Sequence, residues 1–280
     1  MTIEEIIRKA LVEDLGGGDH TSLATIPVGA TGRSRLLIKQ EGILAGIDVA
    51  REVFRQVDPR LAFEKLLDDG AAIRPGDVAF YLSGPGISML SAERLALNFM
   101  QRMSGIATAT HNMVKLIEGT RAKILDTRKT TPLLRELEKM AVRAGGGYNH
   151  RMGLYDMIMI KDNHVDFAGG ISRAIEAVHQ YMSQLKNGND LKIEIEVRNF
   201  RELDEVLQKG GIDRIMLDNF TVEDLARAVS IIGGKYETEA SGGITAATIR
   251  SYAETGVDFI SVGALTHHIN SLDMSLKAVI

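Results

Sequence analysis

Cysteine and tryptophan are both absent from the 280 residues of this chain. The lack of cysteine excludes disulfides, thiolate metal sites and a cysteine nucleophile. Aromatic residues make up only 5% of the chain, too few to favour a stacking platform for single-stranded nucleic acid. The net charge of −4 argues against a duplex binder, which usually carries a basic face across a whole domain. We therefore expect no nucleic-acid partner.

Long apolar runs are also missing, and no stretch approaches the roughly 20 residues needed to cross a bilayer. The first 15 residues, MTIEEIIRKALVEDL, have the pattern of an acidic amphipathic helix rather than that of a signal peptide. These two features predict no membrane partner and a location in the cytoplasm.

The second half of the chain alternates short apolar runs with amphipathic segments. Six runs have the length of strands: residues 123–126, 157–160, 192–197, 214–217, 236–240 and 259–264. Two of the intervening helices are predicted to start at the N-caps Asn199 and Thr221. Such alternation predicts a parallel sheet, and six strands fall short of the eight of a complete barrel. The fold class we expect is α/β, with an incomplete parallel α/β barrel of about six strands.

The first half has a different pattern. Residues 29–46 favour a strand pair with glycine turns, residues 48–58 a helix, and residues 91–119 a long helix. We predict an N-terminal α/β sandwich over residues 1–106 and a catalytic barrel over residues 107–280, with the last residues packing back on the sandwich.

Positive charge is concentrated in one stretch of this mildly acidic chain. From Arg128 to Arg151 there are six Arg or Lys residues and a histidine against two Glu. Arg128, Lys129, Arg151 and Lys161 lie at two predicted strand ends and in the segment between them. Arginine bonds carboxylates and phosphates through a two-pronged fork, and lysine adds a compact charge. The cluster predicts a site for small anionic ligands, although a single such residue is more often a solvated surface charge.

Acidic residues end two neighbouring predicted strands. Glu196 and Asp218 together suit a hard cation such as Mg²⁺, held directly or through water. The alternative for either acid is a structural ion pair, and Glu194, which shares a strand face with Glu196, is a further candidate for that role.

Two later segments are typical of phosphate sites. Ser241 and Gly242 follow a predicted strand and precede a helix expected to begin near Thr245, and a helix N-terminus attracts negative charge. Gly263 follows the next strand, and His267 is expected to face a phosphate beside an exposed His268. Because the carboxyl ends of parallel strands meet at one rim, we expect these residues and the clusters above to converge there.

Long stretches of the sequence resemble the quinolinate phosphoribosyltransferase family. They are, in order, EDLGGGDHTS, ERLALNFMQRMSGIAT, DTRKTTP, AVRAGGGYNHRMGLYDMIMIKDNH, EIEV, LDN, ASGGI and VGALTH. The resemblance covers nearly the whole chain. It implies a type II phosphoribosyltransferase that transfers phosphoribosyl from phosphoribosyl pyrophosphate to quinolinate with decarboxylation. The products would be nicotinate mononucleotide, pyrophosphate and CO₂, made with Mg²⁺ in NAD biosynthesis.

The resemblance also implies roles for single residues. Arg128, His150 and Arg151 would surround quinolinate, and Lys129 and Lys161 would bridge both ligands. Glu196 and Asp218 would lie near the ribose and metal, and the phosphates would be held by Ser241, Gly242, Gly263 and His267. The family implies a homodimer or a higher homo-oligomer, with Arg94 contributed across the interface.

Two alternatives remain open. A related phosphoribosyltransferase acting on a different acid, such as the homologue associated with molybdate transport operons, would share most of these motifs. A catalytically idle paralogue that senses a phosphorylated metabolite would lack a catalytic group, and none is missing. One departure from the family is Leu133, which stands where glycine is usual after TTP; we expect it to open a helix and to alter packing more than chemistry.

Overall fold

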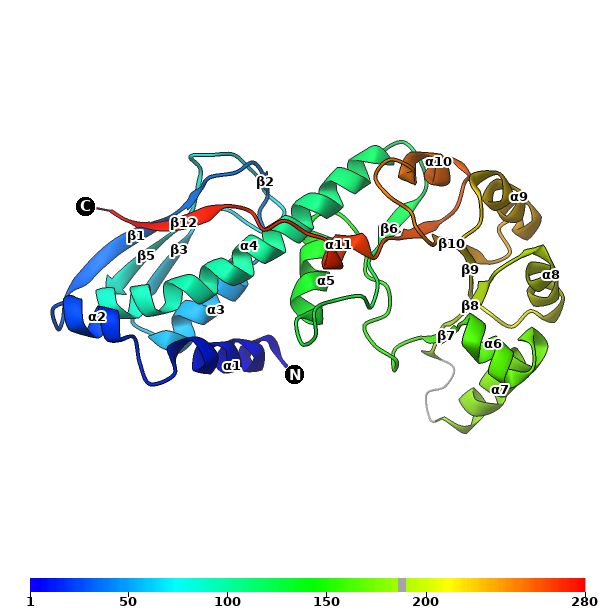
Figure 1. Ribbon diagram of the computed structural model, residues 1–280, viewed down its shortest axis with the longest axis horizontal. Helices are drawn as coiled ribbons and strands as arrows, with labels where there is room; N and C mark the ends of the chain where they lie inside the picture. The colour runs from blue at the N-terminus through cyan, green and yellow to red at the C-terminus, as the bar shows by residue number, and fades with distance from the viewer. Residues whose placement is uncertain (186–189, 280) are drawn as a thin grey trace. The chain divides into compact units, whose positions relative to one another are not determined.

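The computed structural model describes residues 1–185 and 190–279. They form two compact units (Figure 1). The first unit contains residues 1–112, 130–146 and 265–280, and the second contains residues 113–129 and 147–264. Within the described residues, no helix combines the length and apolar character that a membrane span requires.

The first unit has a four-stranded antiparallel sheet in the order β12-β1-β5-β3. Its strands are β1 (Thr31–Ile38), β3 (Ala62–Lys65), β5 (Val78–Pro85) and β12 (Met274–Ala278), and a separate pair is formed by β2 (Gly42–Ile43) and β4 (Ala72–Ile73). Its helices are α1 (Ile3–Leu15), α2 (His20–Thr25), α3 (Ile47–Val57), α5 (Arg135–Ala144), α11 (Ala264–His267) and most of α4 (Gly86–Leu116). The chain thus returns to the first unit for its last strand.

The predicted strand pair in residues 29–46 is wrong in its pairing, because β1 pairs with β5 and β12 whereas β2 pairs with β4. The physical reason lies in α4. Ile43 donates its backbone N–H to the Thr108 hydroxyl at 2.9 Å, and Ala45 donates to the Ser104 hydroxyl at 2.9 Å. These bonds hold the segment against the helix rather than against β1.

The long helix predicted from residue 91 is confirmed as α4. Its buried residues include Ala96, Phe99, Met100 and Met103, which recur at helical spacing and supply the apolar face that packs in the core.

The second unit has six parallel strands in the order β6-β11-β10-β9-β8-β7. They are β6 (Lys123–Leu125), β7 (Ile158–Ile160), β8 (Ile193–Val197), β9 (Arg214–Asp218), β10 (Glu237–Ser241) and β11 (Phe259–Ser261). All six predicted strands are confirmed, and β6 and β7 are the two edge strands of an incomplete α/β barrel. Most residues of these strands are buried, as expected when both faces of a parallel sheet are covered.

The helices of this unit are α6 (Asp162–Ala168), α7 (Ile171–Gln184), α8 (Phe200–Lys209), α9 (Val222–Ile232) and α10 (Ile249–Glu254). Asn199 and Thr221 cap α8 and α9 as predicted, each accepting a backbone N–H three residues later. The expected helix start near Thr245 is wrong. Thr245 and Thr248 instead close a turn, in which the Thr245 N–H donates to the Thr248 hydroxyl, and α10 begins at Ile249.

Candidate functional site

The functional candidates of the second unit lie at the carboxyl ends of its strands. Arg128 and Lys129 follow β6, Lys161 follows β7, Glu196 lies near the end of β8, and Asp218 and Ser241 end β9 and β10. Gly242 follows β10, and Gly263 follows β11. Parallel pairing in register, with Asp218 opposite Ser241, brings these ends to one rim. The rim predicted from the sequence is therefore present in the fold.

The segment that carries His150 and Arg151 is tied to the edge strand β6. Tyr148 donates its N–H to Ile124 O at 2.8 Å and accepts one from Asp126 at 3.1 Å. The buried Asp126 carboxylate then accepts the Asn149 side-chain amide and, at 2.9 Å, the His150 N–H. One carboxylate thus fixes the turn that delivers both basic residues to the rim.

Two arginines lie close enough to influence each other's charge. Burial lowers the pKa of Arg151, and the neighbouring positive charge of Arg128 lowers it further. The Arg151 guanidinium also donates to Met157 O at 3.2 Å. Placing like charges together costs free energy that an anion would recover, so this pair suits a ligand with more than one carboxylate.

Lys129, Lys161, Glu196 and Asp218 form a mixed-charge cluster beside the arginines. Lys161 Nζ lies 3.6 Å from Glu196 Oε2. Burial raises the pKa of Glu196, and the charge of Asp218 adds to the increase. Burial also raises the pKa of Asp218, while the charges of Lys161 and Lys129 oppose that increase. Two neighbouring carboxylates that repel each other suit a hard divalent cation with oxygen ligands.

Asp218 has a neighbour, Asn219, to which the sequence assigns no role. Asn219 has the left-handed φ of 56°, and its side-chain amide donates to Asp218 Oδ2 at 2.6 Å while its N–H donates to Ser241 O at 2.8 Å. Gly242 makes this approach possible. A Cβ on Gly242 would lie 2.2 Å from Asn219 Oδ1, so a side chain there would displace the amide.

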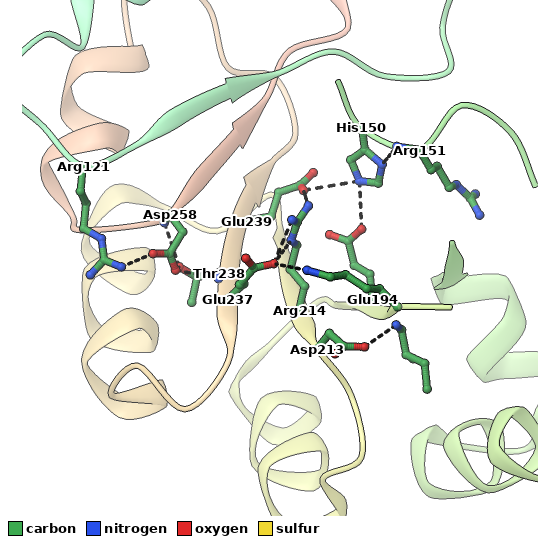
Figure 2. Close-up of polar contacts among 12 residues, drawn as sticks. Arg121, His150, Arg151, Glu194, Asp213, Arg214, Glu237, Thr238, Glu239 and Asp258 are labelled. Carbon is green, nitrogen blue, oxygen red and sulfur yellow. Dashed lines mark hydrogen bonds and ion pairs between the residues drawn. The ribbon is translucent and has the colours of Figure 1, made fainter. Parts of the chain in front are cut away.

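A buried network of charges lies within the barrel beneath the rim (Figure 2). We call His150, Glu194, Arg214 and Glu239 the His150 network. Imidazole Nε2 lies 2.9 Å from Glu194 Oε2 and 3.4 Å from Glu239 Oε2. Arg214 lies 3.2 Å from Glu239 and, through its other nitrogen, 3.0 Å from Glu237. Sequence reasoning named Glu194 as a possible structural partner but missed Arg214 and Glu239, for which the available signal was a charged residue within each of the strand segments RIMLD and ETEAS.

The protonation of this network follows from its surroundings. Burial alone would lower the pKa of His150, but the hydrogen bonds and charges of Glu194 and Glu239 raise it to about 9. Burial and the charge of Glu239 raise the pKa of Glu194 to about 7. The Arg151 N–H, which donates to His150 Nδ1 at 2.6 Å, opposes a proton on Nδ1. A neutral ring that accepts this bond carries its proton on Nε2, which lies 2.9 Å from Glu194 and 3.4 Å from Glu239.

The donor atoms of His150, Glu194 and Glu239 lie within 4.8 Å of one another, a spacing that a metal ion would also accept. The charges argue against an ion here. Arg214 already pairs with Glu239 at 3.2 Å and His150 Nε2 lies 2.9 Å from Glu194, and buried carboxylates with such partners do not need a further dication. The acids that suit Mg²⁺ are Glu196 and Asp218.

Two predicted site residues, Arg94 and His267, belong to the first unit. Arg94 is exposed on α4 between the buried Ala92 and Leu95. His267 ends α11, and its Nδ1 contacts Nδ1 of His268. Both histidines are exposed.

Leu133 does not open α5, which begins at Arg135. Leu133 is 71% exposed and has a φ of 68°, a left-handed conformation that favours glycine. Since the side chain is largely exposed, the departure from glycine changes backbone strain and not core packing, which corrects the expectation from the sequence.

Comparison with known proteins agrees over nearly the whole chain. Residues 106–277 match the family model of the quinolinate phosphoribosyl transferase C-terminal domain, and residues 19–104 match that of its N-terminal domain. The chain is 46% identical to the decarboxylating quinolinate phosphoribosyltransferase 1b of Nicotiana tabacum over 98% of this chain and 82% of the relative. It is 45% identical to the chloroplastic nicotinate-nucleotide pyrophosphorylase (carboxylating) of Arabidopsis thaliana over the same shares.

A solved structure of nicotinate-nucleotide pyrophosphorylase from Francisella tularensis superimposes with a TM-score of 0.92 at 41% identity, covering 99% of this chain and 96% of that one. Family models that together span both units, and relatives well above 30% identity, show the family. The chain therefore belongs to the quinolinate phosphoribosyltransferase family, a family of transferases.

Proposed function

We propose that this protein transfers the phosphoribosyl group of phosphoribosyl pyrophosphate to quinolinate and releases CO₂, in NAD biosynthesis. The observation that carries the proposal is the rim of the second unit, where Arg128 and Arg151 lie beside the cluster of Lys129, Lys161, Glu196 and Asp218. Quinolinate brings two adjacent carboxylates and phosphoribosyl pyrophosphate brings three phosphate groups. The arginine pair suits the carboxylates of quinolinate, and the neighbouring lysines suit the phosphates of the second ligand.

In the first step, the quinolinate ring nitrogen attacks the anomeric carbon of the ribose and the C–O bond to pyrophosphate breaks. Positive charge develops on the ribose as that bond breaks. Glu196 or Asp218 stabilises it, while Lys129 and Lys161 hold the departing anion. In the second step, the bond to the carboxylate next to the ring nitrogen breaks. The electron pair stays on the ring carbon beside the positively charged nitrogen, and a proton then replaces CO₂.

We also propose that Mg²⁺ binds at this site, since Glu196 and Asp218 offer neighbouring carboxylate oxygens. When bound, the ion would neutralise charge on the pyrophosphate oxygens. Ser241, Gly242, Gly263 and His267 are proposed to hold phosphates. For Ser241 and Gly242 the support is their position at the rim and not a helix N-terminus, because α10 begins only at Ile249.

A homodimer or higher homo-oligomer, in which Arg94 reaches the site of a neighbouring subunit, is also proposed. Its support is that Arg94 is exposed on an otherwise well-buried stretch of α4. The cytoplasm is the location we propose, as the sequence predicts.

Equilibrium binding tests the anion site. Quinolinate should bind more tightly than nicotinate, which lacks the second carboxylate and leaves one guanidinium unpaired. Arg128→Ala should weaken quinolinate binding by about 10- to 100-fold, as expected for a lost charged hydrogen-bond pair. The matched control is Arg250→Ala, which removes an exposed arginine that pairs with Glu254 on α10. Equal binding of the two acids, or of quinolinate to both variants, would contradict the assignment.

A further inference from the structure

His150 is a candidate quinolinate ligand, yet both of its ring nitrogens face the protein. Nδ1 accepts the Arg151 N–H at 2.6 Å, and Nε2 lies 2.9 Å from Glu194 and 3.4 Å from Glu239. The His150 side chain is only 6% exposed. A ring can bind a carboxylate only through an N–H that points at it, and the geometry in Figure 2 directs both nitrogens elsewhere.

The carboxylates that hold the ring are fixed in turn. Glu194 and Glu239 are fully buried, and buried charges persist only when paired. Arg214 pairs with Glu239 at 3.2 Å, and its guanidinium stacks 4.0 Å from the centre of the Phe259 ring. The network therefore reaches from β8, β9 and β10 to the turn that carries Arg151.

The network ends at the backbone of Arg151. Its side chain leaves the network and points away from it in Figure 2. The Arg151 N–H is held by His150, the His150 N–H is held by Asp126 at 2.9 Å, and the guanidinium donates to Met157 O at 3.2 Å. The direction of the guanidinium thus depends on an imidazole anchored in the barrel interior.

We propose that the His150 network is a positioning device, and that His150 acts on quinolinate through Arg151 rather than by direct contact. The proposal deepens the proposed function and rests on it for its kinetic test. Effects on quinolinate should be selective, because the network reaches the rim through the backbone of Arg151.

A double-mutant cycle tests the route through Arg151. His150→Ala should raise the KM for quinolinate about tenfold and leave the KM for phosphoribosyl pyrophosphate within twofold. In an Arg151→Ala background, adding His150→Ala should change the quinolinate KM less than about twofold, since residues that act through one another are not additive. A second full tenfold loss in that background would show independent contact with quinolinate and overturn the proposal.

His150→Gln provides the conservative variant. Its amide can still donate to Glu194, so we expect it to recover much of the quinolinate affinity that His150→Ala loses. If the ring instead supplied a charge directly to the ligand, His150→Gln would not recover quinolinate affinity. A quinolinate KM of His150→Gln equal to that of His150→Ala would therefore count against a positioning role.

Two glutamates on β10 offer a matched pair. Glu237 and Glu239 both pair with Arg214, but only Glu239 reaches His150. Glu239→Gln should raise the quinolinate KM, and Glu237→Gln should not. If Glu239→Gln does not fold, Glu194→Gln removes the other carboxylate and carries the same expectation.

Amide hydrogen exchange separates this proposal from the proposed function. Exchange in residues 147–157 should quicken in the Glu239→Gln or Glu194→Gln variant and stay at the wild-type rate in Glu237→Gln. Wild-type protein that does not consume quinolinate would refute the proposed function while leaving this exchange test in force. Unchanged exchange in the glutamate variants that reach His150 would refute the positioning network even in an active enzyme.

Discussion

The approach of Asn219 to Gly242 makes a sharp prediction for Gly242→Ala. Gly242 has a φ of 102°, and an added Cβ would lie 2.2 Å from Asn219 Oδ1 and 2.9 Å from the Asn219 backbone nitrogen. A non-glycine residue at positive φ costs about 1–2 kcal/mol. Displacing Asn219 also breaks its 2.6 Å hydrogen bond to Asp218, and a hydrogen bond to a charged group contributes about 1.5–3 kcal/mol. The expected loss of folding free energy is therefore about 2.5–5 kcal/mol.

Gly243→Ala is the control for this loss. Gly243 also has a positive φ, 59°, but nothing lies within 4 Å of an added Cβ. Its loss should stay near 1–2 kcal/mol, from backbone strain alone. Urea unfolding measures both variants, and steady-state kinetics should show that Gly242→Ala, but not Gly243→Ala, raises the KM for phosphoribosyl pyrophosphate, because Asp218 is released. If the two variants lose equal stability and keep equal KM values, the contact does not hold Asp218 as described.

Three further predictions concern separate features. Leu133→Gly should raise the free energy of unfolding by about 0.5–1 kcal/mol, because relief of left-handed strain exceeds the added entropy of the unfolded chain; a urea midpoint that falls would contradict this. The pKa of His150 is raised to about 9, so its contribution to stability should be complete below its unfolded pKa near 6.5 and lost as pH rises through 9. Melting temperatures between pH 6.5 and 9.5 should accordingly fall less in His150→Gln than in the wild type. Removal of divalent ions with EDTA should abolish turnover, and Asp218→Asn should raise the Mg²⁺ concentration for half-maximal rate about tenfold; full activity in EDTA would exclude a metal role.

The fold could be predicted from the sequence where local pattern and tertiary structure agree. Several of the six parallel strands, such as MIMI at residues 157–160, are short apolar runs in the sequence, because both faces of such a sheet are covered. Asn199 and Thr221 cap their helices through their own side chains, a purely local interaction. The pairing of β1 with β12 joins residues about 240 positions apart, and no local pattern fixes a pairing at such a separation.

The rim was predictable for a similar reason, since strand ends in a parallel sheet meet at one edge. The sequence could not show which charged residues belong to the site and which are buried in the fold. Lys139 belongs to the basic stretch that first suggested an anion site, yet its side chain is fully buried in the first unit. Glu239 lies in a strand with no unusual sequence pattern. Its contact with His150 depends on the turn that carries the histidine, and this turn is held by Asp126, which lies 24 residues earlier in the chain.

The turn before α10 shows the limit of capping signals. Thr245 and Thr248 are both good cap residues, and the sequence does not choose between a helix that starts at the first and a turn that spans both. In the structure the turn prevails, because the Thr248 hydroxyl takes the Thr245 N–H and Thr245 O takes the backbone N–H groups of Thr248 and Ile249. The phosphate proposal for Ser241 therefore depends on the rim rather than on a helix dipole.

Product analysis tests the central claim most directly. The protein is incubated with phosphoribosyl pyrophosphate, Mg²⁺ and quinolinate labelled in the carboxyl group next to the ring nitrogen, with nicotinate in a parallel reaction. We expect nicotinate mononucleotide, pyrophosphate and labelled CO₂ in equal amounts from quinolinate, and no mononucleotide from nicotinate. Folded protein that binds phosphoribosyl pyrophosphate but releases no labelled CO₂ from quinolinate would contradict it.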